Sequence, residues 1–313
     1  MDASTWQQKM QAGGWVDLSR RAKLCFTGAD RLRFLNGQLT QEVRLATNER
    51  AVPTCVTDLK GKIVGEGWLT ARADTLVLDA DADLAETIGP RLERYIIADD
   101  VEMVDHTDDW ALWHWLAPEG ATEAPPPGPE DGNWVAAPRW GAPGWDLWLP
   151  ASARWQPAAD APLWTAEEVE CLRVLRGIPA WPAELNADHF PPEAGLEAYA
   201  MSFTKGCYMG QEVLSRIKTT GKMPQRLVAW RSAAAPPDPP SAGIAAGASV
   251  WLPGTEQPVG AVTSVVRDPA SRQWVGMAYV KQSALPEDSR LLVGADLTKL
   301  TLQIHPIQLS SVS

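Results

Sequence analysis

Apolar and polar positions alternate along residues 51–80, which read "AVPTCVTDLKGKIVGEGWLTARADTLVLDA". Short runs of this kind, bounded by turn-forming groups such as "DLKGK" and "RAD", are typical of strands joined by tight turns. The segment therefore predicts three strands. Two earlier runs, "WVDLS" and "AKLCFTG", predict two more.

Helical spacing replaces this alternation in two segments of the first half. "GADRLRFLNGQL" (28–39) begins with a Gly-Asp turn that can cap a short helix, and "DLAETIGPRLERYIIADDV" (83–101) has helical spacing. Because strands and helices are mixed along the chain, the fold class that the sequence predicts is α+β.

The segment 165–179, "TAEEVECLRVLRGIP", gives the clearest local signal. Thr165 and Glu168 have the spacing of a capping box, in which each side chain satisfies a free backbone donor at the start of a helix. Gly177 then stands where a left-handed C-cap is expected. We predict a helix that begins after Thr165 and ends before Gly177.

Two segments rich in proline, glycine and alanine predict breaks in the chain, at 117–133 and 232–248. The second divides a body, residues 1–231, from a C-terminal module, residues 249–313. The first is either a sub-boundary or a long loop inside the body. In the module, "ASVWLP", "PVGAVTSVV" and "WVGMAYV" are strand-like, and they predict a small antiparallel β-barrel or sandwich.

Charge and hydropathy exclude several classes of protein. The 313 residues carry a net charge of −11, so no global positive field attracts nucleic acid, and we expect no direct nucleic-acid binding. The first residues, "MDASTWQQKM", do not resemble a secretory signal, and no apolar run approaches the roughly 20 residues that span a bilayer. We therefore expect a cytoplasmic protein without a membrane partner.

The four cysteines, Cys25, Cys55, Cys171 and Cys207, are dispersed without a CxxC pair. This spacing argues against a disulfide framework and against a preformed zinc site. The few histidines are not spaced as metal ligands either, and we treat His189 as structural. We expect no metal site.

The decapeptide 204–213, "TKGCYMGQEV", combines residue types that an ordinary core segment does not need. Gly206 and Gly210 permit positive φ or close approach of a ligand to the backbone. "GQEVLSRIK" predicts a helix, so Cys207 would precede a helix N-terminus, two residues from Lys205. The positive charge of Lys205 and the dipole of the helix both favour the thiolate, which is the reactive form of cysteine. The alternative is a small buried cysteine in a tight turn, and spacing alone leaves both open.

The helix predicted between Thr165 and Gly177 leads into a long irregular segment, 176–199, of a kind that is often functional. Glu184 lies there among prolines, near Trp181. It is either a solvated surface carboxylate or a group that grips an N–H pair of a heterocycle. Dinucleotide, P-loop and nucleophile-elbow motifs are absent from the sequence.

The stretch "KGCYMGQE" resembles K-G-C-Y-x-G-Q-E, the motif of the YgfZ family of folate-binding proteins, which includes mitochondrial iron–sulfur assembly factors. "FLNGQLTQEV" (34–43), "DLKGKI" (58–63), "LRVLRGIP" and "PPEAGL" support the resemblance. "PVGAVTSVV" looks like the barrel segment shared with a relative of the family, the glycine-cleavage T-protein. Together these segments cover roughly residues 14 to 300.

The resemblance implies a folate-binding body of two related α+β units around a central channel, followed by a small β-barrel. It also implies a role in maintaining iron–sulfur enzymes, including a tRNA-methylthiolating one, through tetrahydrofolate or a derivative. The partners would then be folate and iron–sulfur proteins or their assembly machinery.

The resemblance also points to particular residues. The motif positions in this sequence are Lys205, Gly206, Cys207, Tyr208, Gly210, Gln211 and Glu212. The hypothesis is a loop that sets the thiol of Cys207 at the mouth of the folate channel, with Lys205 holding anionic or thiolate chemistry.

The resemblance implies a second set of residues, which would bind the folate itself. T-protein relatives clamp the pterin with a glutamate in the loop after the helix that matches 165–176. The nearest equivalent is Glu184, although "AWPAEL" departs from the usual G-x-E. Arg173 and Arg176 either bind the glutamyl tail or form a structural ion pair.

Two other functions stay open. One is an aminomethyltransferase of the glycine-cleavage type. In the T-protein this chemistry relies on an aspartate in the strand that matches "GKIVGEGWL", where this chain has Gly65 or Glu66, a departure that counts against the activity. The other is a non-catalytic, folate-dependent scaffold for an iron–sulfur protein. One loop of this chain cannot supply the four thiolates that a cluster usually needs, so a partner would provide ligands.

Overall fold

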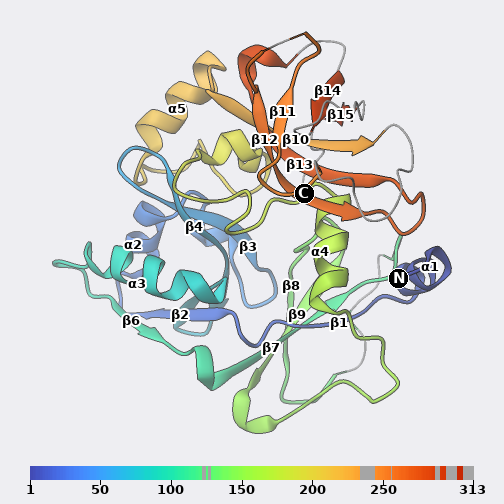
Figure 1. The fold of residues 1–313 in the computed structure, drawn as a ribbon. Coiled ribbons are helices and arrows are strands. Elements are labelled where there is room, and N and C mark those ends of the chain that lie inside the picture. The colour runs from blue at the N-terminus through green and yellow to red at the C-terminus, as the bar shows by residue number, and fades with distance from the viewer. Residues whose placement is uncertain are drawn as a thin grey trace.

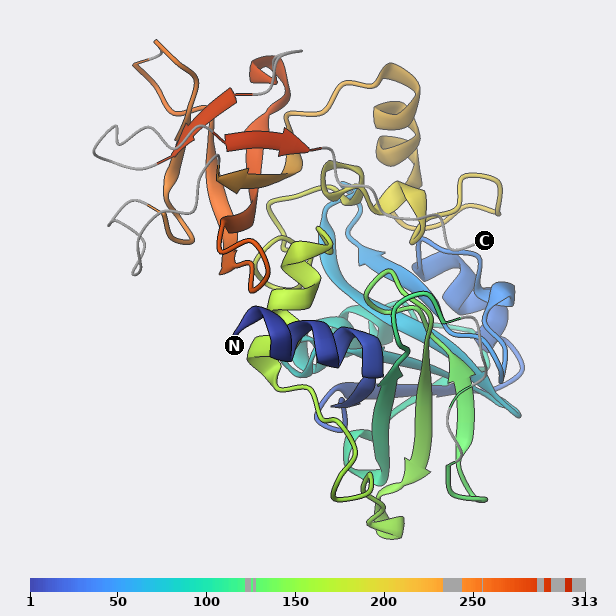
Figure 2. The same cartoon turned by 90° about the vertical axis from the view of Figure 1, so that its right-hand side faces the viewer.

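The chain forms three antiparallel sheets with five α-helices around them in the computed structural model, which describes residues 1–121, 125, 128–232, 244–254, 256–285, 290–293 and 302–305. Two of the sheets pack against each other at one end of the molecule, and a closed barrel occupies the other end (Figures 1 and 2). The α+β class with a C-terminal antiparallel barrel is confirmed.

The first sheet has five strands in the order β3-β4-β5-β2-β6. Their bounds are β2 (Ala22–Thr27), β3 (Val52–Thr57), β4 (Ile63–Arg72), β5 (Thr75–Ala80) and β6 (Glu102–Asp105). The three strands predicted in 51–80 are therefore confirmed. Helices α2 (Arg31–Gln38) and α3 (Ala85–Glu93) cover one face through an apolar core that includes Phe34, Leu35, Ile88 and Leu92 (Figure 1).

The second sheet has four strands in the order β1-β7-β9-β8. Their bounds are β1 (Gly14–Asp17), β7 (Trp110–Leu116), β8 (Asn133–Ala136) and β9 (Gly144–Pro150). One face packs on the uncovered face of the first sheet, through residues that include Cys25, Val77, Leu112 and Trp148. Because β7 and β8 both pair with β9, the segment 117–133 joins two strands of a single sheet, and part of it lies outside the described residues.

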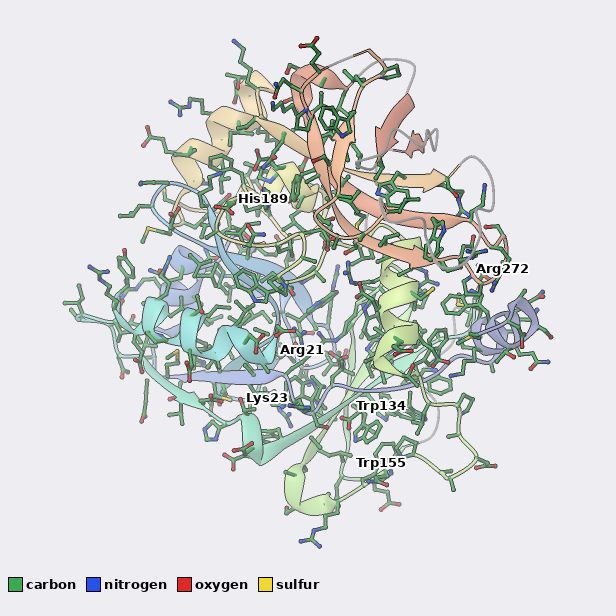
Figure 3. The ribbon with its side chains drawn as sticks, viewed as in Figure 1. Arg21, Lys23, Trp134, Trp155, His189 and Arg272 are labelled. Carbon is green, nitrogen blue, oxygen red and sulfur yellow. The ribbon has the colours of Figure 1, made fainter. Side chains whose placement is uncertain are left out.

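The other face of the four-stranded sheet carries a group of tryptophans. The ring of Trp15 lies 5.3 Å from that of Trp115, 5.6 Å from that of Trp134 and 5.1 Å from that of Trp155, measured between centroids. Figure 3 labels Trp134 and Trp155 in this region, on the side of the molecule away from the barrel. The pairs with Trp115 and Trp155 are edge-to-face, and such pairs each add about 1 kcal/mol to the burial of their surfaces.

Helix α4 (Ala166–Leu175) lies between the sheets and the barrel (Figure 2). Its capping box is present: Thr165 N donates to Glu168 Oε2 at 2.8 Å, and Glu168 N donates to Thr165 Oγ1 at 3.3 Å. Gly177 has φ 67°, as the predicted C-cap requires. Lys9 of α1 (Ala3–Ala12) forms an ion pair with Glu168, which ties the N-terminal helix to the start of α4.

Helix α5 (Gln211–Thr220) begins at the eighth residue of the decapeptide and leads into the barrel, whose strand order is β10-β13-β12-β11-β14-β15. Its strands are β10 (Gln225–Ser232), β11 (Ser249–Trp251), β12 (Gly260–Arg267), β13 (Trp274–Lys281), β14 (Arg290–Val293) and β15 (Leu302–His305). Barrel strands thus lie on both sides of 232–248, most of which is outside the described residues. The division of the chain into domains at that segment stays a prediction.

Candidate functional site

A cavity lies where the two packed sheets meet the loop after α4. It encloses about 670 Å³ of empty space, part of which is open to solvent. Its wall is formed by Leu18, Arg21, Pro53, Thr54, Cys55, Glu66, Trp68, Arg139, Trp140, Arg173, Ile178, Pro179, Ala180, Leu185, Leu196, Tyr199 and Ala200. A concave site with apolar and aromatic walls and a few charged groups is the usual form of a small-molecule site.

Strand β4 delivers a carboxyl group to this cavity. Glu66 lines it, whereas Gly65 points to the opposite face of the sheet, because successive residues of a strand alternate between faces. A Cβ added at Gly65 would come within 2.6 Å of Ile88 Cδ1, so close packing of α3 requires glycine there. Of the two positions that the sequence left open, Glu66 is therefore the one that faces the cavity.

The carboxyl group of Glu66 lies in a low-dielectric setting. Burial raises its pKa, and the nearby guanidinium groups of Arg21 and Arg139 oppose that rise. A raised pKa makes the carboxyl group a stronger base and lets it keep a proton to a higher pH, which is the direction that general acid–base chemistry uses.

An ion-pair network supports the wall beside Glu66. Arg139 Nη2 lies 2.6 Å from Asp79 Oδ1 and 2.6 Å from Asp146 Oδ2, which links a strand of one sheet to a strand of the other. Burial lowers the pKa of Arg139, but Asp146 and Asp79 together raise it more, so its guanidinium stays charged. Asp146 also bonds His114 Nδ1 at 2.8 Å.

Arg21 belongs to the same network but keeps donors available. Its Nε donates to Asp79 Oδ1 at 3.2 Å and its Nη2 to Asp79 O at 3.3 Å, and no acceptor for Nη1 is found among the described residues. Figure 3 labels Arg21 near the middle of the molecule. Arg21 is therefore a cation of the cavity wall with an N–H group left for a ligand.

Glu184, the expected pterin clamp, lies behind the cavity wall and is fully buried. Its Oε2 lies 3.0 Å from Arg173 Nη1 and accepts from Ala180 N at 3.1 Å, while its Oε1 accepts from Ser264 Oγ at 2.6 Å. Since Ser264 is on β12, this carboxylate ties the loop after α4 to the barrel. It holds Arg173 and Ala180, which do line the cavity.

Arg173 uses all five of its N–H groups inside the protein. Nε and Nη2 both donate to Glu170 at 2.6 Å, Nη1 donates to Ile178 O and Glu184, and Nη2 also donates to Ser264 Oγ. Of the two roles that the sequence left open for Arg173, this geometry supports the structural ion pair.

Arg176, the other arginine expected near a glutamyl tail, is not part of the cavity wall. Its Nη1 donates to Trp140 O at 2.8 Å, and Trp140 lines the cavity. Arg176 therefore positions one of the two tryptophans in the wall, and a direct contact with a ligand stays a prediction.

The decapeptide forms a loop next to the segment 37–41. Lys205 Nζ donates to Leu39 O at 2.8 Å and to Gln41 O at 2.6 Å. Burial lowers the pKa of Lys205 to about 8. Its ammonium group thus fixes the backbone of the neighbouring segment, and Cys207 is exposed on the loop.

The loop and the cavity share a wall. Gln41 Nε2 donates to Tyr199 O at 2.9 Å and Thr40 Oγ1 donates to Ala200 O at 2.7 Å, and both Tyr199 and Ala200 line the cavity. Cys207 is not among the lining residues, whereas Cys55 is. The placement of the Cys207 thiol at the mouth of a folate channel therefore stays a prediction.

The segments that carry the family resemblance come together in space. Gly210 has φ 80°, and a Cβ added to it would lie 2.7 Å from Asp58 O in the turn after β3. Thr57 Oγ1 donates to Met209 O at 2.6 Å, and Met209 N donates to Gly37 O at 3.0 Å. The decapeptide thus packs on both 34–43 and 58–63.

The remaining motif residues differ in how far they are exposed to solvent. Tyr208 is buried, and its N–H donates to Gln211 Oε1 at 3.4 Å. Gly206 and Glu212 are exposed, and a Cβ added at Gly206 meets no atom within 4 Å. Of the motif side chains, Lys205 and Tyr208 point into the protein, and Cys207 and Glu212 point to solvent.

Sequence reasoning missed several residues of the cavity wall, among them Arg21, Trp68, Arg139 and Tyr199. Strand alternation was a signal for Trp68, because it shares a strand face with Glu66. The others come from distant segments. His189 stacks on Tyr279 with ring centroids 3.7 Å apart and lies beside Gln225, which agrees with its structural assignment.

The described residues lack a membrane span and a cluster of metal ligands. Every helix there is too short or too polar to cross a bilayer. Nowhere in the described ranges do three or more histidine, cysteine, aspartate or glutamate side chains gather as ligands of a metal ion.

The chain has the fold of the glycine-cleavage T-protein. Its structure superposes on the glycine cleavage system aminomethyltransferase T of Bartonella henselae with a TM-score of 0.81, over 98% of this chain and 89% of that one, at 17% sequence identity. That level of identity shows the fold alone.

The sequence relatives are more specific, although no protein-family model matches the chain. The tRNA-modifying protein YgfZ of Yersinia pseudotuberculosis is 26% identical over 94% of this chain and 92% of its own length. A mitochondrial IBA57 homolog of Neurospora crassa, an iron–sulfur cluster assembly factor, is 25% identical over 69% of this chain and 53% of its own. A putative chloroplast transferase of Arabidopsis thaliana is 25% identical over 95% of this chain and 73% of its own.

These relatives confirm the resemblance that the motif carries. The chain is similar over most of its length to YgfZ and IBA57 proteins, which are related to the T-protein. The names of these relatives refer to iron–sulfur cluster assembly and to tRNA modification.

Proposed function

We propose that this protein binds a reduced folate in the cavity lined by Glu66 and uses it to support the assembly or repair of iron–sulfur enzymes. The observation that carries the proposal is the cavity itself: a T-protein fold holds a carboxyl group, two indole rings and a partly free guanidinium in one concave site. A cytoplasmic location stays part of the proposal.

The wall suits the chemistry of a pterin. A pterin is a flat ring that has N–H donors and hydrogen-bond acceptors along its edge and two apolar faces. Trp68 and Trp140 offer faces for stacking, and Glu66 accepts or donates at the edge. A bound tetrahydrofolate would supply a one-carbon carrier, while Glu66 would hold or move a proton next to it.

The anionic part of a folate needs a cation with free donors. Because Arg173 is fully engaged with Glu170, Glu184 and neighbouring oxygens, we assign this role to Arg21, whose Nη1 is available. Glu184 then contributes by holding the loop residues Arg173 and Ala180 in place, one layer behind the ligand.

The exposed thiol of Cys207 is the group that meets an iron–sulfur partner in this proposal. It lies on a loop fixed by Lys205 and Gly210, so its backbone position is defined while its sulfur is accessible. The partner would supply any further ligands that a cluster needs.

Binding and function are tested by separate experiments. Anaerobic calorimetric titration with tetrahydrofolate is expected to show at least about tenfold weaker binding for Glu66→Gln and for Arg21→Met than for wild type. Glu49→Gln, an exposed carboxylate away from the cavity wall, is the matched control and should bind as wild type does. Equal affinity in all four proteins would remove the cavity from the proposal.

Complementation tests the thiol. In a strain that lacks its own protein of this type, Cys207→Ala is expected to fail to restore iron–sulfur enzyme activity while it still binds tetrahydrofolate. Cys171→Ala, which removes a half-buried thiol elsewhere, is the control and should restore activity. Full restoration by Cys207→Ala would remove the thiol from the mechanism.

One observation favours a second candidate, aminomethyl transfer from a lipoyl carrier protein. In the strand where the T-protein has its aspartate, this chain places the carboxyl group of Glu66 in the cavity. An assay for lipoyl-dependent methylene transfer to tetrahydrofolate decides: turnover that is lost in Glu66→Gln supports this candidate, and no turnover by wild type excludes it.

A further inference from the structure

A second pocket opens at the opposite end of the space between the two packed sheets. It encloses about 1050 Å³ of empty space, part of which is open to solvent. Its lining residues are Cys25, Thr27, Asn48, Arg72, Ala73, Thr75, Val77, His106, Trp110, Asn133 and Trp148. None of them lines the cavity that contains Glu66.

One face of β4 connects the two sites. Glu66 lies in the first cavity, Trp68 and Thr70 follow along the same face, and Arg72 ends the strand in the second pocket. The second pocket is therefore built on the same rigid sheet as the first, at the far end of the strand.

The guanidinium of Arg72 has no anionic partner in the described chain. Its Cζ lies 3.9 Å from the ring centroid of Trp110 and 5.4 Å from that of Trp148, so aromatic rings flank it. Its Nη1 is buried without a hydrogen-bond acceptor among the described residues. Asp74, two residues away, is fully exposed and lies 3.9 Å from Arg31. The ring of His106, which also lines the pocket, is already bonded to Asp109.

A second buried donor stands in the same lining. Trp148 is 1% exposed, and its Nε1 also lacks an acceptor in the described part of the chain. Leaving a buried N–H group unsatisfied costs about 1 to 3 kcal/mol, and more if the group is charged. The lining of this pocket contains no carboxylate, so an acceptor that enters from outside the chain would meet two unpaired N–H groups.

We propose that this pocket binds a small organic monocarboxylate with an apolar or aromatic body. The carboxylate accepts from Arg72 and Trp148, because the planar fork of a guanidinium matches the two oxygens of a carboxylate. A single guanidinium balances one negative charge, which favours a carboxylate over a doubly charged phosphate. Val77, Ala73 and Trp110 supply the apolar wall for the body of the ligand.

Benzoate is a suitable first probe, and 4-phenylbutyrate a longer one. In protein labelled with ¹⁵N at the tryptophan indoles, the Trp148 resonance is assigned by its loss in Trp148→Phe. Titration with either carboxylate is expected to shift that resonance and to saturate below about 20 mM. Benzamide, which has nearly the same shape as benzoate and no charge, is expected to bind at least about tenfold more weakly.

Variants test the role of the charge. Arg72→Met is expected to weaken benzoate binding at least about tenfold, whereas Arg94→Met, which removes an exposed arginine, leaves it unchanged. Glu66→Gln should also leave the affinity for benzoate unchanged. A failure of benzoate to bind is therefore distinguishable from a failure of folate to bind in the first cavity. The benzoate–benzamide comparison needs only the wild-type protein and stays decisive if Arg72→Met does not fold.

Three results would each overturn the proposal. They are equal binding of benzamide and benzoate, displacement of benzoate by an equal concentration of inorganic phosphate, and no saturating shift with either carboxylate.

Discussion

Arg173 and Glu184 form a buried ion pair, with Nη1 and Oε2 separated by 3.0 Å, and this pair joins α4, the loop after it and the barrel. The arginine lines the cavity and the glutamate stands behind it. The two residues are thus the support of the cavity wall, a role that differs from direct contact with a ligand.

Removing one member of this pair should be costly for stability. Glu184→Ala leaves one N–H group of Arg173, the N–H group of Ala180 and the hydroxyl of Ser264 without their acceptor, while Glu170 still balances the guanidinium, so we expect the free energy of unfolding to fall by about 3 kcal/mol. Urea denaturation measures the change. Glu49→Ala, at an exposed position, should stay within about 0.5 kcal/mol of wild type. Equal stability of the two variants would contradict the supporting role.

Glu66→Gln is expected to change stability with pH in a defined direction. Burial raises the pKa of Glu66 above its ordinary value of 4.5, so the unfolded chain loses this proton at a lower pH than the folded chain does. The ionised side chain therefore destabilises the fold once the pH rises above about 4.5. Glutamine cannot ionise, so the variant should be more stable than wild type at pH 7.5, with a smaller difference at pH 4.

Urea midpoints at the two pH values check this expectation. A variant that is less stable than wild type at pH 7.5 would show that the carboxylate of Glu66 is stabilised by its surroundings, contrary to the direction of its pKa shift. In that case Glu66 would not be held in a state that favours its protonated form, and it would not serve in proton transfer.

Two glycines of the decapeptide should respond differently to alanine. Gly210→Ala places a Cβ 2.7 Å from Asp58 O at φ 80°, so we expect a loss of about 2 kcal/mol or more. Gly206→Ala meets no atom within 4 Å and should change stability by less than about 1 kcal/mol. Both are measured by urea denaturation. A Gly206→Ala variant as unstable as Gly210→Ala would contradict the described loop.

Lys205→Met should destabilise the protein and remove a pH dependence. The substitution leaves Leu39 O and Gln41 O without a donor, at a cost of about 2 kcal/mol near pH 7. The folded-state pKa of Lys205, about 8, lies below its ordinary value of 10.5. The unfolded chain therefore binds more protons between these values, and wild-type stability should gain from this group as pH rises from 8 to 10.5.

That gain should be absent in Lys205→Met and present in Lys60→Met, which removes an exposed lysine. Stability is compared at pH 7.5 and pH 10 for the three proteins. An identical pH dependence in wild type and Lys205→Met would show that Lys205 is not held in the partly buried site described here.

Local elements could be predicted from the sequence because short-range physics determines them. The capping box of Thr165 and Glu168 needs only its own four residues, and the three strands of 51–80 follow from alternation and turn residues. The family motif could be recognised because its residues are contiguous.

The partners of the site residues could not be predicted, because they come from distant segments. Glu184 is held by Ser264, 80 positions away, and Lys205 by Leu39, 166 positions away. Neither contact is reflected in a repeating pattern of residues along the sequence. Likewise, the pairing of β10 with β13 joins segments that the chain separates by the residues from 233 to 273.

The sequence alone could have shown on which face of β4 the carboxyl group of Glu66 lies. Gly65 and Glu66 must point to opposite faces of a strand, and the apolar residues Leu69 and Leu78 mark the helix-covered face. Applying that alternation along β4 puts Glu66, Trp68 and Arg72 together on the other face, where both pockets lie.

The most direct test of the central claim is a crystal structure of the protein with tetrahydrofolate, solved without oxygen. We expect the pterin ring in the first cavity, against Trp68 or Trp140 and within hydrogen-bond reach of Glu66. A pterin bound elsewhere, or a cavity that contains only water at saturating folate, would contradict the claim.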